Sequence, residues 1–255
     1  MARFDLSERE WTVISPLLPN KPRGVARKDD RRVLNGIFYT LRTGSPWRDL
    51  PDRYGPYTTC YNRFNRWAKA GVWLKVFEAL AQHSPQSLQL IDSSIIRAHQ
   101  HAAGGKKGGP DHAIGLSRGG LSTKIHAVVD RDGLPIRIAL TAGQTHDQTA
   151  VPALLSDLPP GCDVVADRGY DSNAVLDFIH QAGARAHIPS LSRRLVRRTV
   201  DPAIHRQRNL VERFFNRLKH FRRVATRFDK LARNYLAAVL LASTRLWLRT
   251  YESTT

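Results

Sequence analysis

The chain has 255 residues, and 40 Lys and Arg against 22 Asp and Glu give it a formal net charge of +18. Hydrophobic residues make up 42 % and charged residues 24 % of the sequence, which is typical of a globular protein and excludes a disordered or fibrous chain. The length allows one large domain, or a large domain with a smaller companion. A positive excess of this size is tolerated where phosphates or anionic lipids neutralise it, so nucleic acid is the leading candidate partner.

The sequence contains no stretch with the pattern of a membrane span. Its longest apolar run, residues 235–248, is shorter than the roughly 18 residues that a spanning helix needs, and it contains Arg245. The first ten residues carry Asp5, Glu8 and Glu10 and have no apolar signal core. We therefore expect a cytoplasmic protein.

The two cysteines, Cys60 and Cys162, lie far apart and lack the CxxC spacing of zinc and redox sites. This spacing argues against a disulfide framework or a structural zinc ion. Both are expected to be buried thiols.

Turn signals divide the first segment, about residues 6–82, into short helical stretches. Ser7 followed by Glu10 is a capping-box pattern that predicts a helix start. Apolar residues at helical spacing predict further helices over 33–41, from 58 to about 71, and over 72–81. Basic residues interleave with the apolar face of the third helix: Arg63, Arg66 and Lys69. This pattern resembles a helix-turn-helix reader of duplex DNA, and the alternative is a small helical bundle with solvated arginines.

After a linker at 83–85 the sequence pattern changes. Residues 88–96 form an apolar strand that contains Asp92, and a glycine-rich loop with Lys106, Lys107 and Arg118 is expected over 99–120. A loop of this composition is not expected to form part of a hydrophobic core, and it is expected to become ordered when it binds nucleic acid. The loop also carries His99, His101 and His112; a transition-metal site is one interpretation, but polar or phosphate-contacting histidines are more typical of such a loop.

Strands and helices alternate in the rest of the chain. Strands are predicted over 123–130 and 134–141, joined by a hairpin at Asp132-Gly133, followed by a helix over 148–158. A strand over 162–166, a helix over 173–182, a strand over 185–188 and long helical pattern from about 204 complete the chain. This order predicts a mixed α/β sheet with helices packed on it. We expect a helical domain over 1–84 and a second domain over 85–255.

Three acids are notable for their positions. Asp92 lies within an apolar strand, Asp167 lies at the carboxyl end of another strand, and Glu212 is the only acid between Arg206 and Phe228. Taken singly, Asp92 could cap a turn, Asp167 could pair with its neighbour Arg168, and Glu212 could form a helical salt bridge. A carboxylate in an apolar strand loses hydration, and a divalent cation shared with other carboxylates is one common compensation.

The helix around Glu212 has two distinct faces. At about 100° per residue, Arg208, Glu212 and Lys219 fall within about 40° of one another, whereas an apolar stripe lies on a different side. An acid kept on a cationic surface is explained if it holds metal beside a phosphodiester that the cations bind. The cations around it include Arg213, Arg217, Arg222 and Arg223.

The chemistry that uses such a set is phosphoryl transfer between oxygen nucleophiles. Two Mg²⁺ ions on three carboxylates, with Mn²⁺ able to substitute, can activate a water or a 3′-hydroxyl and stabilise the leaving oxygen. The sequence has no Gly-x-Ser-x-Gly elbow, no Walker A loop and no Gly-x-Gly-x-x-Gly fingerprint. Serine catalysis, nucleotide hydrolysis and dinucleotide binding are therefore poor fits.

Several phrases resemble bacterial insertion-sequence transposases of the DDE type, in the insertion sequence five group. They are Ile91-Asp92-Ser93-Ser94, the run from Ser117 to His126 (SRGGLSTKIH), Ala166-Asp167-Arg168-Gly169-Tyr170 and the run from Arg208 to Lys219 (RNLVERFFNRLK). The resemblance extends over nearly the whole chain and includes Trp47-Arg48-Asp49-Leu50-Pro51 in the first segment.

The resemblance implies an RNase H-like catalytic core over 85–255, with Asp92, Asp167 and Glu212 as the catalytic, metal-holding acids. The group's signature around the glutamate is Tyr-x₂-Arg-x₃-Glu-x₆-Lys. Arg208, Glu212 and Lys219 match it, and His205 stands where the tyrosine is expected. Arg208, Lys219 and His205 carry over as DNA-contacting residues, to which the basic pattern adds Arg217, Arg222, Arg223, Arg63, Arg66, Lys69, Lys106, Lys107, Arg118 and Lys124.

We therefore expect a nucleoid-associated transposase that binds the inverted repeats of its element, exposes a 3′-hydroxyl and joins it to target DNA. Double-stranded DNA would be its partner, and a homodimer or higher oligomer is expected because two ends must be brought together. Two alternatives stay open. A stand-alone RNase H-like nuclease would cut without joining, and a transposase-derived repressor would bind without cutting.

Overall fold

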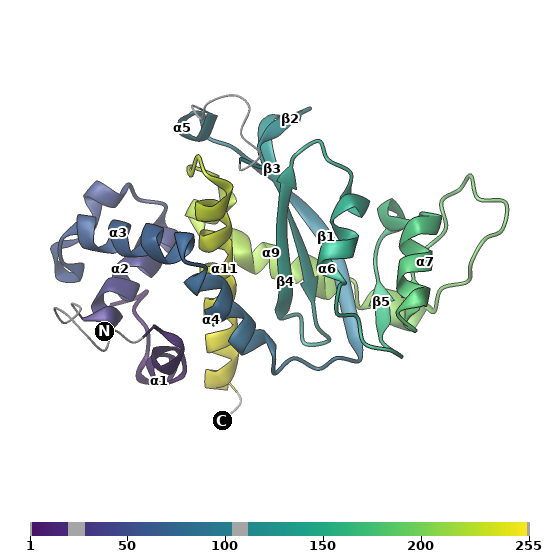
Figure 1. The fold of residues 1–255 in the computed structure, drawn as a ribbon, viewed down its shortest axis with the longest axis horizontal. Coiled ribbons are helices and arrows are strands. Elements are labelled where there is room, and N and C mark those ends of the chain that lie inside the picture. The colour runs from purple at the N-terminus through teal and green to yellow at the C-terminus, as the bar shows by residue number, and fades with distance from the viewer. Residues whose placement is uncertain (1, 20–28, 104–111, 254–255) are drawn as a thin grey trace. The chain divides into compact units, whose positions relative to one another are not determined.

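The computed structural model describes residues 2–19, 29–103 and 112–253, which form two compact units (Figure 1). Unit 1 comprises Met1–Gln82, Ala98–His112 and Leu218–Thr255. Unit 2 comprises His83–Arg97 and Ala113–Arg217. Both units are therefore assembled from segments that are distant in sequence. None of the described helices is long and apolar enough to cross a membrane.

Unit 1 is helical. Its helices are α1 (Glu8–Ile14), α2 (Asp30–Thr43), α3 (Tyr57–Lys69), α4 (Val72–Ala81), α5 (Gln100–Ala103), α10 (Arg222–Ala225) and α11 (Ala232–Ser253), with 3-10 turns η1 (Ser15–Leu17), η2 (Trp47–Asp49) and η3 (Asp52–Tyr54). The four helices expected before residue 82 are confirmed. The long helix α11 packs against α1, α3 and α4, so the end of the chain completes the core of its beginning.

The capping box that predicted the first helix is present at α1. The Ser7 hydroxyl accepts a hydrogen bond from the Glu10 backbone N–H at 3.1 Å, and the Glu10 carboxylate accepts one from the Ser7 N–H at 2.8 Å. Helix α2 ends at Gly44, whose φ of 75° suits glycine. Both cysteines are buried thiols, as expected.

Unit 2 contains a mixed sheet, which confirms the predicted α/β class. Its strands are β1 (Leu88–Arg97), β2 (Gly115–Ser117), β3 (Gly120–Val129), β4 (Pro135–Ala142), β5 (Asp163–Val165) and β6 (Arg185–His187). The strand order is β2-β3-β1-β5-β6, and β4 also pairs with β3. Strand β1 is antiparallel to β3 and parallel to β5, and β5 is parallel to β6.

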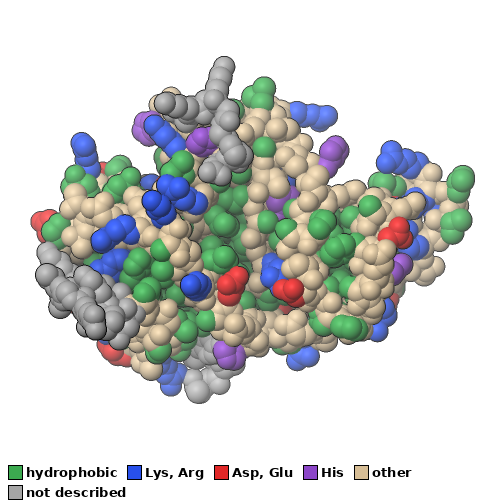
Figure 2. Space-filling model, in the orientation of Figure 1, with side chains coloured by type: hydrophobic (Ala, Val, Ile, Leu, Met, Phe, Trp, Pro, Cys, Tyr) green, Lys and Arg blue, Asp and Glu red, His purple; other side chains and the backbone are tan. Residues whose placement is uncertain are grey.

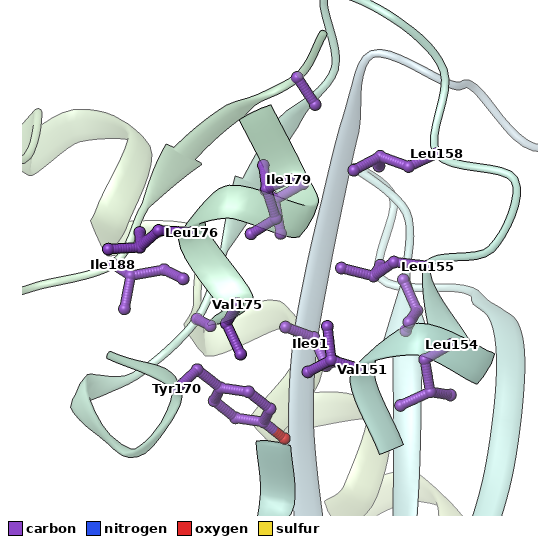
Figure 3. Packing of buried hydrophobic residues seen from close by; sticks show 14 of the residues in the cluster. Ile91, Val151, Leu154, Leu155, Leu158, Tyr170, Val175, Leu176, Ile179 and Ile188 are labelled. Carbon is purple, nitrogen blue, oxygen red and sulfur yellow. The ribbon is translucent and has the colours of Figure 1, made fainter. Parts of the chain in front are cut away.

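The helical elements of unit 2 lie on the two faces of this sheet. They are η4 (Asp147–Ala150), α6 (Val151–Leu154), η5 (Arg168–Tyr170), α7 (Asn173–Gln181), α8 (Pro202–Arg206) and the first part of α9 (Asn209–Lys219). Helices α6 and α7 bury one face in an apolar cluster, where Ile91, Val151, Tyr170 and Val175 point toward one another (Figure 3). Helix α9 crosses behind the strands in Figure 1.

The sequence-based expectations are wrong in two places, and the structure adds detail to a third. The expected loop over 99–120 contains the short helix α5 and the strand β2, which pairs with β3. The expected helix over 148–158 is reduced to η4 and α6, ending at Leu154. The helical pattern from about 204 is divided into four helices, α8 to α11.

Candidate active site

The parallel pairing of β1 and β5 brings Asp92 and Asp167 to corresponding positions. Leu90 of β1 is in register with Val165 of β5, and each of the two aspartates follows two residues later. Neighbouring residues of a strand face opposite sides of the sheet. Ile91 packs on the face covered by α6 and α7, so Asp92 points to the face where Arg208, just before α9, meets it.

Asp92 is the most strongly perturbed carboxyl group of this region. Its side chain is 19 % exposed, Oδ1 accepts a hydrogen bond from the Ser93 N–H at 2.7 Å, and Oδ2 accepts one from Arg208 Nη1 at 3.2 Å. Burial raises the pKa of Asp92 to about 6, and the negative charges of Asp167 and Glu212 act in the same direction. Asp92 therefore senses the charges of both other acids that were predicted from the sequence.

Arg208 joins the strand to the helix. Its guanidinium contacts Asp92 through Nη1 and Glu212 through Nη2, although Asp92 and Arg208 are 116 residues apart in the chain. Glu212 lies in the first turn of α9 with its side chain 49 % exposed. One cation thus links two of the three predicted acids.

Asp167 is fixed by the turn that it begins. It caps η5, where its Oδ1 accepts a hydrogen bond from the Gly169 N–H at 2.8 Å. A Cβ at position 169 would lie 2.9 Å from that same oxygen, closer than such atoms approach. Glycine at position 169 therefore leaves room for the Asp167 carboxylate oxygen that accepts this hydrogen bond.

The three acids suit a hard divalent cation by their chemistry. All supply carboxylate oxygens, the ligands that Mg²⁺ takes in proteins. In the part of the chain that the structure describes, no three His, Cys, Asp or Glu side chains converge closely enough to hold a metal ion. Instead, the Arg208 guanidinium forms ion pairs with both Asp92 and Glu212, so its positive charge neutralises these carboxylates as a bound metal ion would.

A buried polar cluster lies on the opposite face of the same strands, and the sequence did not predict it. Asp147 of η4 accepts a hydrogen bond from the Ser93 hydroxyl at 2.7 Å and pairs with Lys124 Nζ at 2.8 Å. His126 is fully buried 4.0 Å from Asp147, and burial lowers its pKa to about 4. Burial, with the charges of Asp147, Asp92 and Asp167, raises the pKa of Tyr170, so this phenol stays protonated at neutral pH.

The residues predicted to contact DNA fall into two groups by exposure. The exposed ones are Arg66, Lys69, Arg118, Arg217, Lys219 and Arg222, of which Arg217 donates a hydrogen bond to the Gly133 carbonyl at 2.9 Å. The buried ones already have partners: Arg63 pairs with Asp30, Arg223 with Asp229 and Lys124 with Asp147. A buried cation cannot reach a DNA phosphate without giving up its partner.

The remaining candidates are spread over both units. His205 lies in α8, with Nε2 buried and without a hydrogen-bond partner among the described residues. The rings of His99 and His101 stack edge-on at 4.5 Å, and His112 Nδ1 lies 3.0 Å from the Lys230 carbonyl oxygen. Lys106 and Lys107 lie outside the described residues. On the face drawn in Figure 2, many separate Lys and Arg side chains are visible.

Comparison with known proteins identifies the family to which the chain belongs. Residues 83–247 match the family described as "Transposase DDE domain", which covers more than half of the chain. A putative transposase for insertion sequence element IS6501 from Brucella ovis is 38 % identical over 130 residues, which are 51 % of this chain and all of that protein. The chain belongs to the family of DDE transposases.

A second family match, in the first segment of the chain, indicates which group of transposases the chain resembles. Residues 6–77 match a family described as "Putative transposase of IS4/5 family". A protein of Sinorhizobium fredii, y4sN, with no assigned function, is 37 % identical over 120 residues, 45 % of this chain and 96 % of its own length. The expected relationship to insertion-sequence transposases is confirmed, and the protein is an enzyme that cleaves and transfers DNA strands.

A solved structure supports the fold. The piggyBac transposase synaptic complex with hairpin DNA has a TM-score of 0.53 and 10 % sequence identity, covering 98 % of this chain and 74 % of that chain. This similarity concerns the fold, and together with the strand order it confirms the RNase H-like architecture expected for the core. Membership of the DDE family carries with it dependence on a divalent metal ion.

Proposed function

We propose that Asp92, Asp167 and Glu212 are the catalytic carboxylates with which this transposase cleaves the ends of its element and joins them to target DNA. The observation that carries the proposal is the convergence of β1, β5 and α9. Asp92 lies in β1, and Asp167 lies at the corresponding position just beyond the end of the parallel strand β5. Arg208 contacts both Asp92 and Glu212, although Asp92 and Arg208 are 116 residues apart in the chain.

The same three carboxylates would hold two Mg²⁺ ions, with Mn²⁺ as a substitute. When bound, the ions would polarise the scissile phosphate and favour ionisation of the attacking hydroxyl. Arg208 would then release at least one carboxylate and turn its charge to the DNA phosphate, since a guanidinium and a metal ion compete for the same oxygens. Asp167 is already oriented for such a role by its hydrogen bond from Gly169.

DNA would be held by cations that are free to meet phosphates. We assign this part to the exposed residues Arg66, Lys69, Arg118, Lys219 and Arg222, together with Arg208. The helical segment 1–84 would serve as the DNA-binding domain and 85–255 as the catalytic domain. Two DNA ends must be joined in one reaction, so the active form would be a homodimer or a higher oligomer acting at the nucleoid in the cytoplasm.

Arg63, Arg223 and Lys124 would act within the fold. Each is at most 7 % exposed and paired with an acid, and Arg63 and Arg223 also lie over the rings of Trp67 and Trp47. Their contribution to DNA binding would be indirect, through the stability of the elements that carry the exposed cations.

A strand-transfer assay on the element's own terminal DNA tests the proposal. The natural chain with Mg²⁺ should yield joined product, Glu212→Gln should yield none, and Glu78→Gln, an exposed acid of α4, should behave as the natural chain. DNA affinity of Glu212→Gln should be equal or higher, because a negative charge near phosphate is removed.

Three results would contradict the proposal. Cleavage without joining would identify a nuclease, and tight binding without either reaction would identify a repressor. Joined product from Glu212→Gln at the natural rate would remove Glu212 from the active site.

A further inference from the structure

A cavity of about 530 Å³ lies in unit 1, and the proposed function uses only two of the residues that line it, Lys219 and Arg222. Four cations line it: Arg3 near the start of the chain, Arg42 in the last turn of α2, Lys219 at the end of α9 and Arg222 in α10. Phe4, Thr43 and His220 complete the lining, so no carboxylate is among the residues that form its wall.

This lining differs from the surroundings of other arginines in the same unit. Arg31 pairs with Glu8 at 2.6 Å, Arg63 with Asp30, and Arg245 with Glu10 at 2.9 Å. Among the described residues, by contrast, no acid forms an ion pair with Arg3, Arg42, Lys219 or Arg222. The cavity thus gathers cations to which the fold supplies no counter-charge.

Arg42 shows the cost of this arrangement. It is half-buried, and its guanidinium lies 5.2 Å from the ring centroid of Phe221. Burial lowers the pKa of Arg42, and the positive charges of Arg249 and Arg3 lower it further. Desolvated like charges destabilise the free protein, and an anion in the cavity would relieve the repulsion.

The backbone near the cavity is shaped to bring two of these cations together. Gly44 ends α2 with a φ of 75°, and a Cβ built there would lie 3.0 Å from the Cβ of Arg222. A side chain at position 44 would therefore be strained and would press on Arg222. With glycine, the end of α2 that carries Arg42 packs directly against the start of α10.

We propose that this cavity is a phosphate-binding site that takes a backbone phosphate of the DNA on which the enzyme acts. Arginines bind phosphate oxygens through paired N–H groups, and several cations at one cavity match the charge of a phosphodiester and its neighbours. The inference rests on the proposed DNA-joining function and adds Arg3 and Arg42, which the sequence did not indicate, to Lys219 and Arg222.

Binding of a labelled duplex, measured against NaCl concentration, tests this site in the full chain. Arg42→Gln and Arg222→Gln should each reduce the slope of log Kd against log salt by about 0.9 for each phosphate that the variant no longer neutralises, and weaken binding by roughly 3- to 10-fold at low salt. Arg48→Gln, an exposed arginine outside the cavity, is the matched control and should leave the slope unchanged.

Thermal unfolding without DNA separates a binding role from a structural one. Arg42→Gln should unfold at the same or a higher temperature than the natural chain, because repulsion with Arg3 and Arg249 is relieved. Inorganic phosphate should raise the unfolding temperature of the natural chain more than chloride at equal ionic strength. The Arg42→Gln, Arg222→Gln double variant should not show that gain.

Two outcomes would overturn the proposal. Stabilisation by inorganic phosphate with an unchanged DNA salt slope would identify a small-anion site, and variants that keep both properties would leave the cavity without an anion. If the proposed function itself fails, the natural chain will bind terminal DNA without cleaving or joining it. If both proposals hold, Glu212→Gln will lose strand transfer without losing DNA affinity, whereas the cavity variants will show a reduced salt slope of DNA binding.

Discussion

Replacement of Asp92 by Asn should make the metal-free protein more stable while abolishing DNA cleavage. Burial raises the pKa of Asp92 from 3.8 to about 6 in the folded state, aided by Asp167 and Glu212. Each pKa unit corresponds to about 1.4 kcal/mol, so keeping this carboxylate ionised at pH 7 lowers the free energy of unfolding by about 3 kcal/mol. A neutral amide of the same shape removes most of this cost.

The sign of the effect fixes its pH dependence. A raised folded-state pKa means that the native state binds the proton more tightly than the unfolded state, so stability falls as pH rises from 3.8 to about 6. Urea unfolding in EDTA should therefore show Asp92→Asn more stable than the natural chain at pH 7, and the difference should vanish below about pH 4.

Asp163 supplies a control of opposite sign on the neighbouring strand. Arg185 lowers the pKa of Asp163 through two hydrogen bonds of 2.7 and 2.9 Å, and His187 adds a third at 2.8 Å. Asp163→Asn should therefore destabilise the protein at pH 7, with the loss fading as the pH falls. The reasoning is refuted if Asp92→Asn is the less stable protein at pH 7, or if its gain persists unchanged at low pH.

Three further outcomes are expected. Gly169→Ala should keep the fold but slow cleavage at least 10-fold, since the added Cβ displaces the Asp167 carboxylate. The control Gly119→Ala, whose Cβ would meet only the Ser117 hydroxyl at 3.9 Å, should cleave at the natural rate. Equal cleavage rates for the two variants would count against the role of Gly169. Arg63→Ala should lower the free energy of unfolding by about 3 kcal/mol, measured in urea, because it removes the buried guanidinium that pairs with Asp30, and an unchanged stability would argue for a surface role of Arg63. Mg²⁺ should raise the unfolding temperature of the natural chain without DNA but not that of Asp92→Asn, and equal shifts in both would remove Asp92 from the metal site.

Elements with strong local signals were predictable from the sequence. The Ser7–Glu10 capping box and the apolar spacing of residues 72–81 depend on neighbours within one or two helical turns, and α1 and α4 form where these signals indicate. The position of Asp92 in a strand was readable for the same reason. The grouping of Asp92 with Glu212 was suggested by the positions of the three acids and by the family resemblance. The contact between Asp92 and Arg208 was not predicted, since a contact across 116 residues leaves no local pattern.

The features that the sequence did not predict arise where long-range contacts decide the structure. The helical run near the C-terminus is interrupted before α11, where the fully buried Arg227 donates hydrogen bonds to the carbonyl oxygens of His112, Asp229 and Lys230. These bonds satisfy backbone groups that a helix would otherwise use. The sequence also did not show that Lys124 pairs with Asp147 in a buried cluster, because a lysine in a strand has the same local appearance whether exposed or buried.

A metal-specificity switch at Asp92 tests the central claim most directly. Asp92→Cys replaces a hard oxygen ligand with a thiolate, which binds Mg²⁺ poorly and Mn²⁺ better. Cleavage of terminal DNA by this variant should be abolished in Mg²⁺ and partly restored in Mn²⁺. Asp147→Cys, in η4 against the opposite face of β1, should show no such change of metal preference. Full activity of Asp92→Cys in Mg²⁺, or the same metal preference as the natural chain, would contradict the account.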